Sequence, residues 1–158
     1  MTSGEICFWT GAVYRGRAIL SYAADLDRIP VFIRGGSVIP LNLSDRFELG
    51  HSHGNRVDGY ENLCFLVTGL PSPGYESGGG GGGRYEFEDD LGNRVLLTVE
   101  GGKINASASG PAREIHVIVP RAGLMDGPAR PVRINGINGR EMYLHSVPSA
   151  RTKPRTKH

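Results

Sequence analysis

We predict an all-β protein, an antiparallel β-sandwich preceded by part of a smaller β domain. Short runs of β-branched and aromatic residues recur between Gly, Pro and Asn, whereas almost no stretch shows a long apolar period of 3.6 residues. Glycine provides 24 of the 158 residues, about twice its usual share of roughly 7%. This composition favours turns and hairpins over helices.

The first apolar segment covers residues 29–41, where nearly every position is apolar except 34–37. This pattern predicts two buried strand pieces joined across a bulge or a tight bend. Pro30 and Pro40 stand near its ends, where a strand tolerates proline. The sequence then becomes polar and glycine-containing over residues 43–60, which indicates a loop or a domain boundary.

We therefore divide the chain into a partial β domain at residues 6–42 and a β-sandwich at 43–147. Six consecutive glycines at 78–83 predict a flexible loop over 74–83. This run is a spacer and not a phosphate-binding loop, because it lacks both the Lys-Ser/Thr pair and the helix that would follow. The basic tail at 148–158 is expected to be disordered.

Within the sandwich, alternation of apolar and polar residues predicts several strands. Tyr85 and Phe87 share one strand face and Glu86 and Glu88 the other. A glycine pair at 101–102 supplies the turn of a hairpin. The remaining expected elements are a strand at 63–67, a turn at 89–93, the hairpin strands at 95–99 and 104–108, and strands at 115–119 and 132–134. Such spacing of strands and turns is typical of a β-sandwich.

Composition and charge exclude some partners and name none. The formal net charge is +2 with both signs spread along the chain, so we expect neither a nucleic acid nor a membrane partner. Apolar runs fall far short of the roughly 20 residues of a membrane span, and the first residues lack the features of a secretory signal. Localisation is therefore unknown. Cys7 and Cys64 lie in apolar surroundings, and a disulfide between them stays an open alternative without support in the sequence.

Two segments resemble a known family. Residues 8–16 and 26–40 resemble the segment that follows the catalytic barrel in family 31 glycoside hydrolases, the α-glucosidase and α-xylosidase family. The pattern is a Trp-Thr-Gly turn, a Tyr-x-Gly and an Ile-Pro-Val-Phe-x-Arg-x-Gly strand ending in Ile-Pro. Residues 83–92 are similar to the Tyr-Glu-Asp-Asp-Gly segment of the distal C-terminal sandwich. The motif residues are Trp9, Gly11, Pro30, Arg34, Gly36, Pro40, Asp89, Asp90 and Gly92.

The resemblance covers roughly residues 8–142 and implies a supporting role. Leu91 is inserted in the Asp-Asp-Gly turn, and the barrel with its Trp-x-Asp-Met-Asn-Glu type nucleophile motif is missing. A retaining glycosidase needs two carboxyl groups about 5 Å apart, held on barrel loops. No catalytic residue, metal or cofactor is therefore assigned. The implied partner is the catalytic barrel of a longer hydrolase, which this β-module would stabilise.

Several residues could suggest chemistry, but each has a simpler interpretation. Glu86 and Glu88 share a water-facing strand surface, so we do not expect an acid/base pair. The Asp89-Asp90 pair fits a turn better than a calcium site. The histidines at 51 and 53 have metal-like spacing without a third ligand, which favours a solvated loop.

The aromatic residues and one arginine allow sharper hypotheses. Trp9 and Tyr14, with Tyr22, could stack on sugar rings, although core packing is the simpler expectation. Arg34 would need a carboxylate partner if it were buried, and the barrel could supply it. Two other classes of function remain open. The chain could be a free-standing carbohydrate-binding module or a protein-interaction module, and a truncated reading frame is a further alternative.

Overall fold

The computed structural model describes residues 5–10, 12–14, 19–23, 29–46, 48, 62–68, 82–120, 122–134 and 142–150. Regular structure within these ranges consists of strands, so no described helix could span a membrane. The strands are β1 (Glu5–Cys7), β2 (Val13–Tyr14), β3 (Phe32–Arg34), β4 (Val38–Asn42), β5 (Leu63–Val67), β6 (Gly82–Glu88), β7 (Arg94–Glu100), β8 (Lys103–Ser109), β9 (Glu114–Val119), β10 (Arg130–Val132) and β11 (Met142–Ala150). The prediction of an all-β protein is confirmed.

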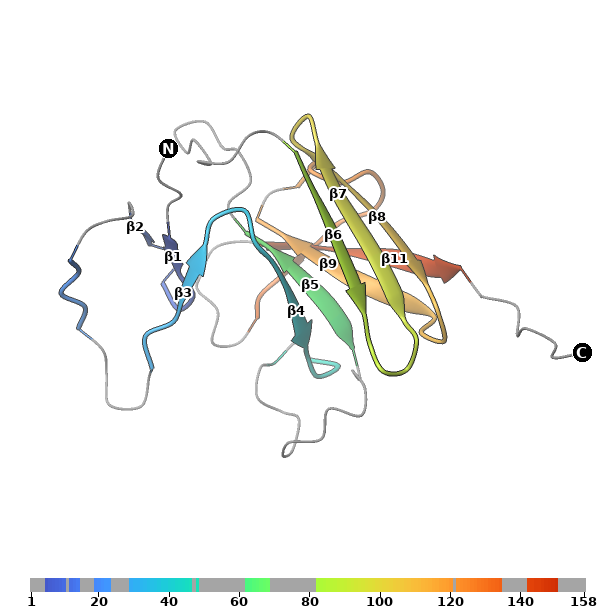
Figure 1. The fold of residues 1–158 in the computed structure, drawn as a ribbon, viewed down its shortest axis with the longest axis horizontal. Helices are drawn as coiled ribbons and strands as arrows, with labels where there is room; N and C mark the ends of the chain where they lie inside the picture. The colour runs from blue at the N-terminus through green and yellow to red at the C-terminus, as the bar shows by residue number, and fades with distance from the viewer. Residues whose placement is uncertain are drawn as a thin grey trace, which may run out of the picture.

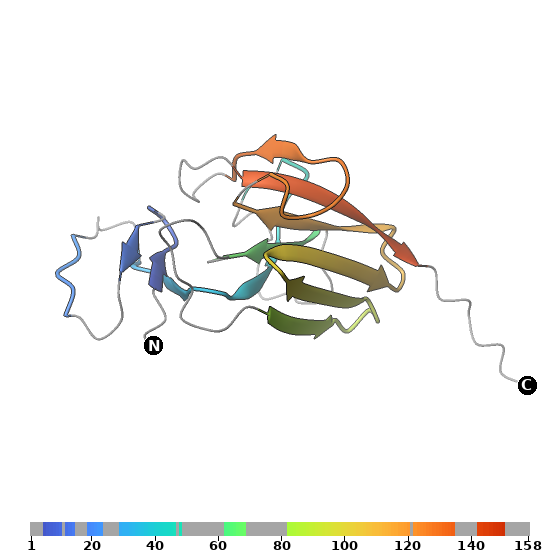
Figure 2. The same cartoon turned by 90° about the horizontal axis from the view of Figure 1, so that it is seen from above.

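The strands form a small sheet and a large one (Figure 1). The small sheet has the order β2-β1-β3, and the large one runs β4-β5-β9-β11-β8-β7-β6 with β10 paired to β11. Seen from above, β9, β10 and β11 form one layer and β6, β7 and β8 the other (Figure 2). Most neighbours are antiparallel, as predicted, but the β5-β9 and β11-β8 pairs are parallel.

Strand β11 joins the two layers of the sandwich. Its first part, from Tyr143 to Pro148, pairs with β9, while its last two residues, Ser149 and Ala150, pair with the end of β8. One continuous strand therefore belongs to both layers. We named no strand in this stretch and expected the tail to begin at Pro148, whereas β11 continues to Ala150.

Hydrophobic residues gather in two core clusters on opposite faces of β5 and β9. The first cluster lies between the layers and contains Phe65, Leu97, Ile104 and Val117. The second covers the other face with Cys64, Leu66, Ile118 and Leu144. Every residue of β5 is buried, which explains why this strand reads as an unbroken apolar run. Phe8 packs against the second cluster and so connects the small sheet to the sandwich.

Three expected boundaries differ in the structure. Strand β4, placed at the end of the 6–42 unit, pairs with β5 of the large sheet, so the tight bend at 35–36 joins strands of different sheets. Gly82 and Gly83, placed in the flexible loop, begin β6. Residues 148–150, placed in the tail, end β11 because they pair with β8 and β9. The division into domains stays a prediction, and residues 74–81 and 151–158 lie outside the described residues.

Candidate functional site

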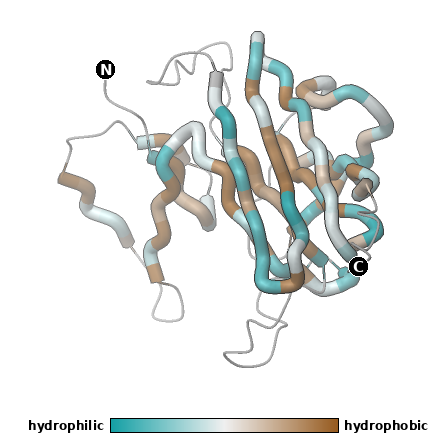
Figure 3. Tube along the Cα trace, turned by 45° about the vertical axis from the view of Figure 1, so that its right-hand side comes forward, coloured by the Kyte–Doolittle hydropathy of each residue, from teal (hydrophilic) through white to brown (hydrophobic). Residues whose placement is uncertain are grey.

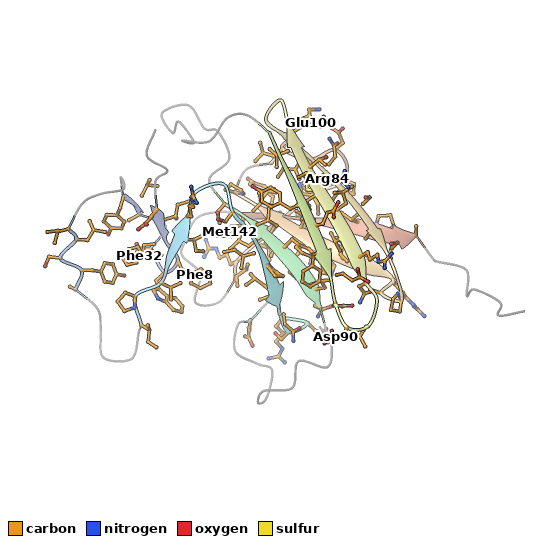
Figure 4. All side chains as sticks on the ribbon, in the orientation of Figure 1. Phe8, Phe32, Arg84, Asp90, Glu100 and Met142 are labelled. Carbon is orange, nitrogen blue, oxygen red and sulfur yellow. The ribbon has the colours of Figure 1, made fainter. Side chains whose placement is uncertain are left out.

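The aromatic residues weighed as sugar contacts pack in two groups beside the small sheet, one around Trp9 and one around Phe32. Trp9 Nε1 donates a hydrogen bond to the Ile29 carbonyl at 2.7 Å, and the Trp9 ring meets Phe8 edge-on with centroids 5.0 Å apart. Tyr14 and Tyr22 both meet Phe32 edge-on, at 5.7 and 5.6 Å. Figure 4 places Phe8 and Phe32 together at this end of the molecule. All of these rings are half-buried, so their packing stabilises the small sheet.

Cys7 and Cys64 are both buried, and both are free thiols. Burial raises the pKa of Cys64 to about 12, which keeps it a neutral core residue. Burial also acts to raise the pKa of Cys7, but hydrogen bonds from Thr10 and Tyr22 outweigh it and hold this pKa below the usual value of 9.0. The Cys7 sulfur lies 3.4 Å from the Tyr22 hydroxyl.

The motif residues around β3 and β4 lie at a strand end, in a tight bend and on an edge strand. Arg34 is exposed at the end of β3, so this chain does not bury it by itself, and a carboxylate partner from the barrel stays a prediction. Gly36 has a φ of +80°, a conformation that favours glycine. Its carbonyl accepts a hydrogen bond from the Tyr85 hydroxyl. Pro30 is exposed, and Pro40 lies on β4, an edge strand where its missing N–H is tolerated. Gly11 lies outside the described residues.

The acidic motif builds the turn between β6 and β7. Asp89 Oδ1 accepts hydrogen bonds from the amides of Leu91 and Asn93 at 3.0 and 2.8 Å, and Oδ2 accepts one from Asn93 Nδ2 at 2.8 Å. Gly92 has a φ of +82°. Asp90 is exposed at the tip of this turn (Figure 4). Asp89 therefore holds the turn, and the extra residue Leu91 is accommodated within it.

Asn93 extends this turn to a second loop. Its side chain is buried, and its Oδ1 accepts a hydrogen bond from the amide of Ala112 at 2.8 Å. Gly110 lies against it with a φ of +132°, and a Cβ there would approach the Cα of Asn93 to 2.7 Å. Asp89, Asn93 and Gly110 thus hold two loops together at the end of the sandwich. We call these three residues the locked corner. The sequence indicated the turn but gave no sign of the contact between the two loops.

The acidic pair on β6 is solvated, as expected. Glu86 is paired with Arg84, and Glu88 Oε1 lies 3.0 Å from the guanidinium of Arg94. Within the described ranges, no three His, Cys, Asp or Glu side chains gather as metal ligands. The histidines at 51 and 53 lie outside those ranges.

One buried histidine was missed in the sequence. His145 is 2% exposed, and neither of its ring nitrogens has a hydrogen-bond partner in the part of the chain that the structure describes. It shares its face of β11 with Tyr143 and Val147, which pack against the first core cluster. Burial lowers the pKa of His145 below 6.5. This histidine between the two layers of the sandwich is therefore held neutral, without a partner among the described residues.

Exposed apolar side chains concentrate near the small sheet. Ile19 is fully exposed and Ile29 is 78% exposed, and Val13, Leu20 and Val31 are also exposed. Figure 3 shows brown, hydrophobic segments at this end, away from the sandwich. We call these five residues the apolar patch.

Comparison with known proteins agrees with the all-β architecture. No protein-family model matches the chain. An isomaltosyltransferase of Sporosarcina globispora is 36% identical over 90 residues, which are 57% of this chain and 7% of that protein. The cycloalternan-forming enzyme of Listeria monocytogenes, solved with a pentasaccharide substrate, matches with a TM-score of 0.62 and 20% identity. An uncharacterized protein of Listeria monocytogenes EGD-e gives the same values.

The chain is related to carbohydrate-active enzymes. Each structural match covers 94% of this chain and 15% of the solved one. The chain therefore corresponds to a small β-rich portion of much longer proteins. The solved structures, at 20% identity, support the fold alone. The similarity in sequence comes from the match at 36% identity.

Proposed function

We propose that the chain is the non-catalytic C-terminal β-domain of a family 31 glycoside hydrolase, in which it supports the catalytic barrel. The parent would act on α-glycosidic bonds of glucosides or xylosides by a retaining double displacement. The observation that carries the proposal is the sequence match to an isomaltosyltransferase, of which the chain covers only 7%. The motifs around Trp9 and Asp89 support the choice of family.

The described carboxylates support a role without catalysis in this chain. Retaining glycosidases hold two carboxyl groups about 5 Å apart, with separate roles as acid and nucleophile. Glu86 and Glu88 are instead exposed and each is paired with an arginine. Asp89 is committed to its own turn. The motif residues thus serve the fold, and we expect the reacting groups to lie in the barrel.

The apolar patch is the surface that we assign to the barrel. Burying an exposed isoleucine removes enough apolar area from water to contribute roughly 1.5–3 kcal/mol. Ile19 and Ile29 are the two most exposed large hydrophobic residues described. The patch lies next to Trp9, whose indole is bonded to the Ile29 carbonyl. A rigid small sheet would therefore present these side chains to the rest of the longer protein.

An activity measurement tests the non-catalytic role. The pure chain should release no product from 4-nitrophenyl α-glucoside, maltose or isomaltose. The proposal fails if the chain turns over one of these substrates and substitution of its acidic residues abolishes that turnover.

A stability measurement tests the docking surface in the longer protein. The double substitution Ile19→Ser and Ile29→Ser should lower the Tm of the full-length protein and leave the Tm of the isolated chain unchanged. Leu91→Ser is the matched control, because Leu91 is exposed but lies at the far turn. Equal effects of the double variant and the control on the full-length protein would contradict the assignment.

A further inference from the structure

The outer face of β6, β7 and β8 carries a depression that has no role in the proposed function. Its polar and exposed lining comes from alternate positions of the three strands, while the residues between them point to the core. In Figure 4, Arg84 lies near the start of β6 and Asp90 in the turn that follows this strand. The lining side chains used below are Glu86, Glu88, Arg94, Leu96, Ser107 and Ser109.

Strand register arranges these six side chains in two rows across the sheet. Glu86 pairs with Leu96, and Leu96 pairs with Ser107. In the next row Glu88 pairs with Arg94, and Arg94 pairs with Ser109. Neighbouring strands are about 4.8 Å apart, and residues i and i+2 about 7 Å apart. The two rows therefore span roughly 10 by 7 Å, the size of one or two pyranose rings.

The lining chemistry matches a neutral polyhydroxylated ligand. Carboxylates accept hydrogen bonds from hydroxyl groups, guanidinium groups donate to them, and serine does both. Glu88 and Arg94 are already paired at 3.0 Å, so they present an acceptor and donors side by side to vicinal hydroxyls. Leu96, half-buried in the middle of its row, gives an apolar floor for the C–H face of a sugar ring.

Other ligand classes fit this face less well. Two carboxylates repel a phosphate or another anion, and their arginine partners leave the face without the positive excess that nucleic acids need. An aromatic ligand would need a ring on which to stack, and Phe87 points from β6 toward the core, where its ring meets Phe65 at 5.3 Å.

We propose that this depression is a binding site for the sugar rings of a neutral oligosaccharide, distinct from the aromatic cluster around Trp9. The proposal goes beyond the proposed function, which assigns no ligand to this chain. Open sites of this size with few contacts give dissociation constants of about 1 mM. Binding here and support of a barrel are independent, so either one can fail alone.

The test is a titration of the pure chain with isomaltotriose, and separately with maltotriose, followed by amide chemical shifts. We expect saturable shifts confined to β6, β7, β8 and the end of β11. Arg94→Gln should weaken binding about tenfold, since one charge-assisted contact to a hydroxyl is lost. The matched control is Lys103→Gln, a charge on the same face of β8 that does not line the depression.

Three results would overturn the proposal. The first is the absence of saturable shifts at about ten times the expected dissociation constant, which would make this a solvated sheet surface only. The second is equal weakening by Arg94→Gln and Lys103→Gln. The third is a set of shifts confined to the small sheet, which would place the sugar on the Trp9 cluster. An unchanged thermal transition in each variant shows that a loss of binding is not a loss of fold.

Discussion

Removing the carboxylate of Asp89 should destabilise the sandwich, whereas removing that of Asp90 should not. Asp89→Ala deletes three accepted hydrogen bonds and leaves the amides of Leu91 and Asn93 without their acceptor. Bonds to a charged acceptor contribute about 1.5–3 kcal/mol each when protected, and less in a partly exposed turn. We expect a loss of about 2–4 kcal/mol in the free energy of unfolding.

Asp89→Asn separates geometry from charge. An asparagine still accepts from the two backbone amides, but its NH₂ group would face the NH₂ group of Asn93, so two donors would oppose each other. Asn93 cannot simply turn over, because its oxygen accepts from Ala112. We expect a cost of about 1–2 kcal/mol, from one lost bond and one unpaired donor. Asp90→Asn, at an exposed position, should stay within about 0.5 kcal/mol.

Urea unfolding followed by far-UV circular dichroism measures these differences. In thermal unfolding, the Tm of a chain of this size shifts by about 2–4 °C per kcal/mol, so Asp89→Ala should lower the Tm by roughly 4–16 °C. Equal transitions for the Asp89 and Asp90 variants would refute the reasoning that the Asp89 side chain holds this corner.

Three further substitutions test the packing. Gly110→Ala should lower the free energy of unfolding by about 2–4 kcal/mol, because φ is +132° and the new Cβ would lie 2.7 Å from the Cα of Asn93. An unchanged urea midpoint would contradict this. Tyr85→Phe should cost about 1 kcal/mol through loss of its bond to the Gly36 carbonyl, and an unchanged Tm would count against that bond. His145→Leu should raise stability by about 1–2 kcal/mol by removing unpaired buried nitrogens, and should make stability less sensitive to acid.

The sign of the acid effect follows from the lowered pKa of His145. In the unfolded chain histidine takes up a proton near its ordinary pKa of 6.5, but the buried His145 does so only at lower pH. The unfolded state therefore binds more protons as pH falls below 6.5, and the free energy of unfolding decreases. His116 acts in the same direction, mainly through burial, with Glu114 opposing and Arg130 adding.

Urea unfolding at about pH 8 and about pH 5 compares the wild type with His145→Leu. The variant should lose less stability between the two values, and His116→Gln serves as the second histidine for comparison. If wild type and His145→Leu lost the same amount, His145 would not be the group that titrates on unfolding.

The sequence predicted most of the sandwich because its strands alternate. Tyr85 and Phe87 face the core while Glu86 and Glu88 face water, and Gly101 and Gly102 adopt the positive φ that their hairpin needs. β5 was recognised as a short apolar run between polar stretches. In each case the local pattern is a direct consequence of which face is buried.

The sequence could not predict the features that depend on contacts between distant segments of the chain. β11 carries a buried histidine and a proline, so its residues lack the signature of a core strand, and only its pairing with β9, β10 and β8 makes it one. The locked corner joins Asp89 to Gly110 across two loops, and no local pattern signals such a contact. The apolar neighbours of Arg34 left its burial open, and in the structure it is exposed at the end of its strand.

The most direct test of the central claim is the sequence of the transcript upstream of Met1 in the same reading frame. We predict that it encodes a barrel with a Trp-x-Asp-Met-Asn-Glu type motif, which would make this chain the supporting β-domain of an α-glycosidase. An in-frame stop codon directly before Met1, with no barrel sequence between them, would contradict that account.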